Sequence, residues 1–405
     1  MKIVFVHQDG LLTGSAFSLL NLIRGYKGKF DVHVVLAEPG PYQTLLEAEG
    51  ISTSICRFIR FWTFPGPNWY QKHAFLQLKA ALPDKLLRKH ILDLEPDIIH
   101  LNDKATMQAG VSLRNSGIPI VQHLRSSYFP TYSPVTKFLS IICIQKYASA
   151  LIAISEDEID GFVKDKRLSI IFNTVNLTET EQAIVQKETV RAEWGIQEDE
   201  IVIGYAANIS GAKGAWDFLN MAIALCENYP DKKLRFVMAG NLPNAPVNPG
   251  RLVRWGLRKL ENPKARLDAF QAHPLLKDKL LVLGFQKVIL PIIAAMDILV
   301  VCTRLGVLGR QPFEAMAVKT PVVVTSGHSG KSRVILNEET GLVAPMKNLS
   351  GLINAVSRLV DDPEMRVRLS ENGYDYALKN FNPEINSNKV QAIYKALSNA
   401  ESQAQ

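Results

Sequence analysis

The chain has 405 residues, of which 47% are hydrophobic and 21% charged, and its formal net charge at pH 7 is +7. This length exceeds one ordinary hydrophobic core and the composition is typical of a soluble globular protein, so we expect two domains. We expect neither a signal peptide nor a membrane-spanning helix, because polar residues 7–9 interrupt the apolar start and no apolar run reaches the ~18 residues that a bilayer requires.

Short β-rich apolar runs alternate with helical stretches along the chain, a pattern typical of parallel α/β domains. In the first half these runs lie at residues 3–6, 32–36, 98–101, 120–122, 151–154 and 170–172. In the second half they lie at 201–205, 234–239, 281–283, 298–301, 321–324 and 342–344. A polar stretch at 174–200 has no strand pattern and separates the two series. We therefore predict one parallel-sheet domain at 1–185 and another at 186–382.

The loop after the first run contains Gly10 and Gly14 and leads into an apolar helical pattern that Ser15 can begin. In open parallel sheets, ligands bind beyond the carboxyl ends of the strands. A helix N-terminus at such a place offers free amide groups to a phosphate or to an acceptor molecule. An ordinary turn between a strand and a helix accounts for the same residues, so both interpretations stay open.

His123 comes directly after the fourth run, and Arg125 follows in the next loop. A histidine at the tip of a strand can hold a substrate hydroxyl or help a proton to leave. A structural role is the alternative interpretation. His100, in the run at 98–101, is the competing histidine, and we expect it to support the sheet.

Two polar side chains of the second half follow strands in the same way. Lys213 lies in a Ser-Gly-Ala-Lys-Gly turn after the run at 201–205, where a fixed cation can neutralise the charge on a departing diphosphate. Glu314 lies in the first turn of a predicted helix after Gly309, and the amides near Arg310 and Gln311 would face an anion. Glu314 can accept hydrogen bonds from two ribose hydroxyls, or it can simply favour the helix dipole.

Residues 57–90 carry seven Lys or Arg side chains, a single acid and seven aromatic side chains. This mixture suits an anionic membrane surface or an anionic lipid-linked acceptor. A solvated helical face beside a loop that packs its aromatic residues inward is the alternative. Because no nucleic-acid-binding motif accompanies the basic residues, we do not expect nucleic acid as a partner.

Ten segments, taken in order, resemble those of glycosyltransferase family 4 over nearly the whole chain. They are LTGSAF, PDIIHLN, ASALIAISE, IFNTVN, GAKG, RFVMAG, LVLGF, MDILVVCTR, GRQPFEAMAVKTPVVVT and EETGLVAP, and the stretch 296–345 is the most specific. This resemblance implies the GT-B fold, in which two Rossmann-like α/β domains face a central cleft. It also implies that residues 383–405 cross back to the first domain, and that the enzyme retains the anomeric configuration of the sugar it transfers.

The same resemblance implies roles for individual residues. His123 and Lys213 would be the catalytic pair, with Lys213 on the phosphates of a nucleotide-sugar donor and His123 beside its sugar. The donor-binding set would be Asn208, Gly284, Phe285, Gly309, Arg310, Gln311 and Glu314. Within it, Glu314 would bind the ribose, the amides of residues 309–311 the diphosphate, and the loop at 284–285 the base. Gly14, Ser15 and Arg125 would form the loop for the acceptor and the diphosphate.

Three positions depart from the family pattern. Gly306 stands where a second glutamate, eight residues before Glu314, usually touches the sugar. Asn208 stands where many members have an arginine, and Ser-Gly-Lys-Ser-Arg at 329–333 replaces a Gly-Gly-x-Pro-Glu segment. Arg310 and Lys331 are the candidates to replace the missing positive charge.

The resemblance implies a hexosyltransferase that needs neither a metal nor another cofactor. The absence of an Asp-x-Asp sequence for a metal-bound diphosphate is consistent with this. Its acceptor would be a glycan or lipid-linked molecule of polysaccharide, lipopolysaccharide or glycolipid synthesis, used in the cytoplasm or at the inner face of the membrane. The alternatives are a catalytically inactive partner protein of the same fold, which Gly306 would suit, and a sugar-nucleotide epimerase. A nicotinamide dehydrogenase is disfavoured, because neither first run is followed by Gly-x-Gly-x-x-Gly.

Overall fold

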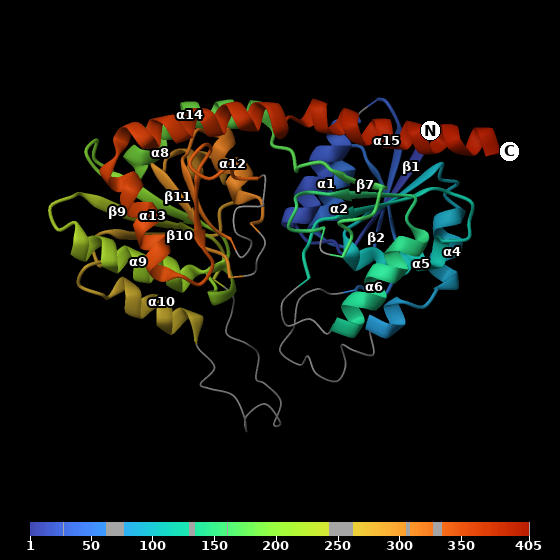
Figure 1. Cartoon of the computed structure of the whole chain (residues 1–405), viewed down its shortest axis with the longest axis horizontal. Helices are drawn as coiled ribbons and strands as arrows, with labels where there is room; N and C mark the ends of the chain where they lie inside the picture. The colour runs from blue at the N-terminus through green and yellow to red at the C-terminus, as the bar shows by residue number, and fades with distance from the viewer. Residues whose placement is uncertain are drawn as a thin grey trace, which may run out of the picture. The chain divides into compact units, whose positions relative to one another are not determined.

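The computed structural model describes residues 1–26, 28–61, 77–128, 134–159, 161–242, 262–304, 308–326 and 334–404. The chain divides into two compact units (Figure 1). Unit 1 comprises Met1–Thr174 and Pro383–Gln405, and unit 2 comprises Val175–Asn382. The first boundary falls at Thr174 rather than at the predicted residue 185, because helix α7 (Leu177–Val185) packs against α11 (Leu290–Ala294) of unit 2.

Unit 1 contains a seven-stranded sheet in the order β3-β2-β1-β4-β5-β6-β7, and every neighbouring pair is parallel. The strands are β1 (Lys2–His7), β2 (Asp31–Leu36), β3 (Ser52–Ile55), β4 (Ile98–Asn102), β5 (Ile120–Leu124), β6 (Ala150–Ala153) and β7 (Leu168–Ile170). The apolar runs did not predict β3. Its sequence is mostly serine and threonine, because a strand at the edge of the sheet is only partly buried.

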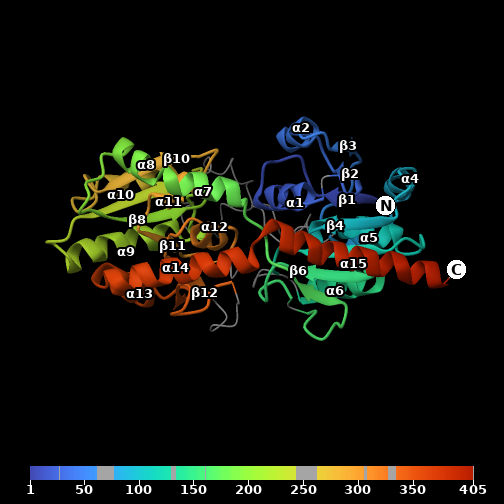
Figure 2. The same ribbon diagram turned by 90° about the horizontal axis from the view of Figure 1, so that it is seen from above.

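Helices cover both faces of this sheet. Helices α1 (Gly14–Arg24), α2 (Pro41–Ala48) and α15 (Pro383–Ala404) contribute to one core layer. Helices α4 (Lys85–Leu92), α5 (Met107–Leu113) and α6 (Pro134–Tyr147) contribute to the other. Through α15, drawn in red in Figures 1 and 2, the end of the chain packs with unit 1, where it contacts α1.

Unit 2 contains a six-stranded parallel sheet in the order β10-β9-β8-β11-β12-β13. The strands are β8 (Ile201–Ala206), β9 (Leu234–Ala239), β10 (Leu280–Gly284), β11 (Ile298–Val301), β12 (Val322–Ser326) and β13 (Leu342–Pro345). The other helices that the structure describes in this unit are α8 (Lys187–Glu193), α9 (Ala215–Asn228), α10 (Pro263–Gln271), α12 (Gln311–Ala317), α13 (Leu349–Asp361) and α14 (Pro363–Asn380). A short 3₁₀ turn, η2 (Gly211–Lys213), links β8 to α9.

The two parallel sheets place the loops that follow their strands at one edge of each unit, which is where open α/β sheets bind ligands. In the described part of the chain, no helix combines the length and the apolar character that a bilayer crossing demands. Because ligands bind at these edges, we expect the site residues predicted from the sequence to lie at the carboxyl edges of the two sheets.

Candidate active site

A row of three polar side chains crosses the carboxyl edge of the unit 1 sheet. In the strand register, His7 of β1 pairs with Asn102 of β4, and Asn102 pairs with His123 of β5. Paired residues of neighbouring parallel strands face the same side of a sheet, so the three side chains are neighbours. All three are buried, and the Asn102 amide donates a hydrogen bond from Nδ2 to Nδ1 of His7 over 2.8 Å.

Arg125 joins this row to the rest of the edge. Its Nε donates to Oδ1 of Asn102 at 2.5 Å, and one terminal nitrogen donates to Oδ1 of Asn173 at 2.6 Å. The other terminal nitrogen lies 3.3 Å from Nδ1 of His123. Because a guanidinium presents its donors in one rigid plane, these contacts fix where the positive charge lies.

The histidines of this edge are neutral at pH 7. Burial, reinforced by the charge on Arg125, lowers the pKa of His7 from 6.5 to about 3. The same two causes hold the pKa of His100 and of His123 well below the usual value. His123 is 3% exposed, and its Nε2 has no hydrogen-bond partner among the described residues. A neutral imidazole with an unsatisfied ring nitrogen is equipped to hold a substrate oxygen rather than to supply positive charge.

His7 makes the stability of the protein sensitive to acid. Below pH 6.5 the unfolded chain takes up a proton at His7 that the folded chain, with its pKa of about 3, does not bind. Stability from this group is therefore present above pH 6.5 and is lost as the pH falls, by up to about 1.4 kcal/mol per pH unit. We expect urea unfolding to show that, between pH 6.5 and 5, the free energy of unfolding of the wild type falls relative to that of His7→Gln by up to this slope. His273→Gln in unit 2 is the control, and parallel profiles for His7→Gln and the wild type would contradict the expectation.

The loop after β1 reaches the same row. The side chain of Thr13, rather than Ser15, caps α1 by accepting a hydrogen bond from the amide of Ala16, and Ser15 lies inside the first turn. Asn102 donates from Nδ2 to the carbonyl oxygen of Ser15 at 3.3 Å, which ties this turn to the polar row. Gly14 begins the helix and is exposed. The predicted loop residues of unit 1 and Arg125 thus share one edge with His123.

At the carboxyl edge of unit 2, Lys213 ends the η2 turn. Gly214 follows with φ +80°, and a Cβ there would lie 1.8 Å from the carbonyl oxygen of Cys302, so the tight turn requires glycine. Burial lowers the pKa of Lys213. Among the residues that the structure describes, no carboxylate lies within ion-pair distance of its ammonium group. This cation is held in place and available to an anionic ligand.

Lys213 and Gln311 line the same small cavity. The cavity lies at the ends of β8 and β11, and its other lining residues are Tyr205, Ala206, Ala207, Val300, Val301, Thr303 and Leu308. Oε1 of Gln311 is buried and has no hydrogen-bond partner within the described ranges. The fold therefore brings together two predicted donor-site residues that are almost one hundred positions apart in the sequence.

Glu314 lies in the first turn of α12, as predicted, and is 7% exposed. Oε1 of Glu314 accepts a hydrogen bond from Nε of Arg310 over 3.0 Å, so the carboxylate is held by the turn that precedes the helix. Gly309 in that turn has φ +75°, a conformation that favours glycine. Arg310 therefore forms an ion pair with a predicted ribose-binding residue and is not an isolated positive charge.

The other predicted donor-site residues follow β8 and β10. Asn208 is exposed in the loop after β8, and its carbonyl oxygen accepts a hydrogen bond from the Tyr205 hydroxyl at 2.7 Å. Gly284 ends β10 with φ +68°, and the next residue, Phe285, is 71% exposed. An aromatic ring so exposed beside a strand end is free to stack on a ligand. Gly306, Lys331 and the segment 329–333 lie outside the described residues.

Sequence reasoning missed His7, Asn102 and Asn173 as members of the site. His7 was noticed only because it interrupts an apolar run, and the two asparagines were not singled out. The available signal was position: each of these residues lies at or just after the carboxyl end of a predicted strand. Their contacts depend on the strand order, which local sequence does not contain.

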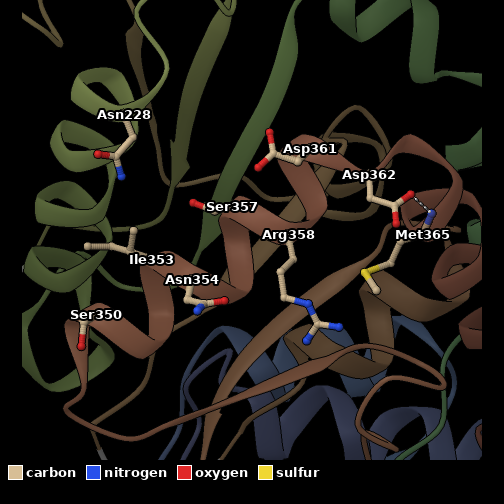
Figure 3. A pocket seen from close by; sticks show the side chains of 9 residues that line it. All are labelled: Asn228, Ser350, Ile353, Asn354, Ser357, Arg358, Asp361, Asp362 and Met365. Carbon is tan, nitrogen blue, oxygen red and sulfur yellow. Dashed lines mark hydrogen bonds between the residues drawn. The ribbon is translucent and has the colours of Figure 1, made fainter.

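A second hollow lies along α13 of unit 2 (Figure 3). Its lining residues are Asn228, Ser350, Ile353, Asn354, Ser357, Arg358, Asp361, Asp362 and Met365. Two of its charged groups are engaged elsewhere, since Arg358 pairs with Glu338 and Asp361 pairs with Lys232. None of the predicted site residues lines this hollow, so we do not include it in the candidate site.

Two family models together match most of this chain. The family described as Glycosyltransferase Family 4 matches residues 12–179, and the family described as Glycosyl transferases group 1 matches residues 186–376. An Escherichia coli UDP-Gal:alpha-D-GlcNAc-diphosphoundecaprenol alpha-1,3-galactosyltransferase is 24% identical over 97% of this chain and 96% of its own length. The alpha-D-kanosaminyltransferase of Streptomyces kanamyceticus is 24% identical over 69% of this chain and 71% of its own length.

Solved structures resemble this chain in their fold. The crystal structure of Anabaena HepE in complex with UDP superimposes with a TM-score of 0.77 at 19% identity, over 98% of this chain and 100% of that one. The two parallel-sheet units therefore have the GT-B fold that the sequence resemblance implied.

Proposed function

Because this chain belongs to glycosyltransferase family 4, we propose that it transfers a sugar from a nucleotide diphosphate to a glycan or lipid-linked acceptor with retention of configuration. The observation that carries the proposal is that Lys213 and Gln311 line the same small cavity at the ends of β8 and β11. An ammonium group and an unsatisfied amide oxygen at the same strand ends suit a ligand that has both phosphate oxygens and hydroxyl groups.

Unit 2 supplies the groups for the donor nucleotide. Lys213 stabilises the negative charge that grows on the diphosphate as the bond to the anomeric carbon breaks. The turn at 309–311 approaches the diphosphate through its backbone, and Glu314 accepts hydrogen bonds from the ribose hydroxyls. Phe285 stacks on the base, for which its exposed ring is suited.

Unit 1 supplies the groups for the sugar and the acceptor. His123, neutral at pH 7, presents Nε2 to an oxygen atom of the transferred sugar. Burial keeps the imidazole rings from taking up protons by lowering their pKa, and the positive potential of Arg125 at the same edge adds to this effect. The turn at Gly14 and Ser15 faces the acceptor.

The donor that we propose to test first is a UDP-sugar. One relative is named for its use of UDP-Gal, and the Anabaena structure contains UDP. The proposal gives no role to a metal ion and rests in this respect on the missing Asp-x-Asp sequence, since such a pair of aspartates is what would hold a metal on the diphosphate.

The test is a thermal-shift panel with UDP-, GDP- and ADP-sugars, followed by turnover assays with the sugars that bind. A ligand that binds the folded state raises the melting temperature by mass action. Transfer of sugar to an added glycan or lipid-linked acceptor supports the proposal. Binding without any turnover indicates an inactive partner protein, and conversion of the nucleotide sugar without an acceptor indicates an epimerase.

We expect Glu314→Gln to raise the Kd of the bound nucleoside diphosphate about 10-fold or more, because a charged hydrogen-bond acceptor contributes about 1.5–3 kcal/mol. Isothermal titration calorimetry measures the Kd. Glu364→Gln is a matched control, because Glu364 also lies in the first turn of a helix, α14, but is exposed. An unchanged Kd together with a lower melting temperature would instead show that Glu314 serves the helix and Arg310.

We also propose that α4 and its surroundings bind an anionic membrane surface. The predicted aromatic residues 62, 64, 69, 70 and 75 lie outside the described residues, but α4 itself exposes Lys85, Lys89 and the side chain of Leu86, which is 79% exposed. Leu87 and Ile91 hold its opposite face in the core. Cations beside an exposed leucine suit the headgroup region of an anionic bilayer.

We expect the double variant Lys85→Glu, Lys89→Glu to bind vesicles that contain anionic lipid about 30-fold or more weakly, because each surface cation contributes about 1 kcal/mol. Vesicle sedimentation at several salt concentrations measures the binding, which salt should weaken. Lys264→Glu, Lys277→Glu makes the same charge change at exposed lysines of unit 2 and should have little effect. Equal binding of the wild type to neutral and anionic vesicles would contradict an electrostatic role.

A further inference from the structure

A chain of hydrogen bonds runs from His123 through the interior of unit 1 to the C-terminal helix. Nδ1 of His123 lies 3.1 Å from Nε2 of His100, and Nδ1 of His100 lies 2.6 Å from the hydroxyl of Tyr394. Tyr394 is a fully buried residue of α15, and it packs with His100 through its ring as well. The proposed reaction itself gives no role to His100 or Tyr394. Their effect on His123 is to determine which of its ring nitrogens carries the proton.

Arg125 determines the direction of the first hydrogen bond. A guanidinium can only donate, and one of its terminal nitrogens lies 3.3 Å from Nδ1 of His123. In this structure Nδ1 of His123 therefore presents its lone pair, although one contact of 3.3 Å does not hold the ring in that tautomer without further support. Since a neutral imidazole carries one ring proton, the proton of His123 lies on Nε2.

The directions of the remaining bonds follow from the first. If Nδ1 of His123 accepts, Nε2 of His100 must donate to it, so His100 also carries its proton on Nε2. Nδ1 of His100 then has a lone pair, and the Tyr394 hydroxyl donates to it. In this arrangement Nδ1 of His123 accepts from both His100 and Arg125, and the N–H at Nε2 of His123 is left without an acceptor among the described residues. The opposite tautomer of His123 would direct its N–H at the N–H of Arg125.

We propose that His100 and Tyr394 are positioning residues, which act together with Arg125 to fix His123 in the tautomer that carries its proton on Nε2, so that this N–H donates to an oxygen atom of the transferred sugar. The part that concerns the sugar rests on the proposed function. The N–H at Nε2 is buried and has no partner in the described ranges, and leaving such a donor unsatisfied destabilises the free protein. A bound oxygen atom would satisfy it without any rearrangement of the ring.

The matched pair His100→Gln and His100→Met tests the proposal. Both side chains are close to each other in size, but only glutamine has an N–H that can donate to Nδ1 of His123 and an oxygen that can accept from Tyr394. Long-range ¹H–¹⁵N spectra of the imidazole rings report which nitrogen carries the proton, and His123→Gln identifies the His123 signals. Tyr394→Phe removes only the hydroxyl group and provides a second route if His100→Met does not fold.

We expect the wild type and His100→Gln to show the proton of His123 on Nε2, and His100→Met and Tyr394→Phe to show a mixture of tautomers. In sugar transfer, kcat should fall about 10-fold or more in His100→Met and recover in His100→Gln, the scale of one hydrogen bond to a buried group. A wild-type spectrum with the proton on Nδ1, or an unchanged His123 spectrum in both folded variants, would overturn the proposal. The predicted tautomers without sugar transfer in the wild type would support the positioning role and contradict the proposed function.

Discussion

Replacement of Lys213 by alanine is expected to lower kcat by about 100-fold or more, the scale for one preorganised group that stabilises a developing charge. The η2 turn and Gly214 hold Lys213 at the end of β8, and burial lowers the pKa of its ammonium group. A cation that has already lost part of its hydration gains more from a diphosphate than an exposed lysine would. Steady-state kinetics at saturating donor measure the loss.

The alkaline side of the pH profile gives a second measurement of the same residue. Because the pKa of Lys213 lies below its usual value, the wild type should lose activity as the pH rises before exposed lysines lose their protons. Lys213→Arg should keep its charge and extend activity to higher pH, at some cost in kcat because the guanidinium has a different shape. Lys264→Ala, at an exposed position of α10, is the control. Wild-type kcat in a folded Lys213→Ala protein would remove this residue from the reaction.

The strands were predictable wherever burial imposes an apolar run. Apolar residues make up most of the buried strands β1, β4 and β8, because parallel strands covered on both faces favour apolar side chains. The same reasoning failed at β3, whose serine and threonine side chains lie at the edge of the sheet. It also placed α7 in the first domain, because a polar helix between two domains carries no local sign of which core it joins.

The candidate site was predictable residue by residue but not as a network. His123, Lys213 and Glu314 could be singled out as candidates because each follows a strand and carries a chemically distinctive side chain. The contacts of Arg125 with Asn102 and Asn173 depend on the order β4-β5-β6-β7, since the three residues come from different strand ends. His100 was expected only to support the sheet. Its contact with Tyr394 joins residues 294 positions apart, a separation that no local pattern can reveal.

Replacement of His123 by alanine is expected to lower kcat/KM for sugar transfer by about 100-fold, the scale measured when one buried hydrogen-bond donor is removed from a preorganised site. His123→Gln separates the two chemical roles that a histidine can have here. Because the pKa of His123 is held well below its usual value by burial and by Arg125, we expect the ring to act as a neutral donor. Glutamine retains an N–H near the position of Nε2 but cannot exchange a proton near neutral pH.

If His123 acts as a donor, His123→Gln should recover at least about 10-fold of what His123→Ala loses, because one neutral hydrogen bond contributes about 1 kcal/mol and more when it is buried. If His123 acts as a base, glutamine and alanine should be equally damaging, and the wild-type rate should rise with pH through the pKa of the ring. Titration calorimetry with the donor shows whether the loss lies in binding or in turnover. Equal losses in both variants would therefore contradict the donor role, and with it the purpose that we assign to the hydrogen-bond chain from Tyr394 through His100.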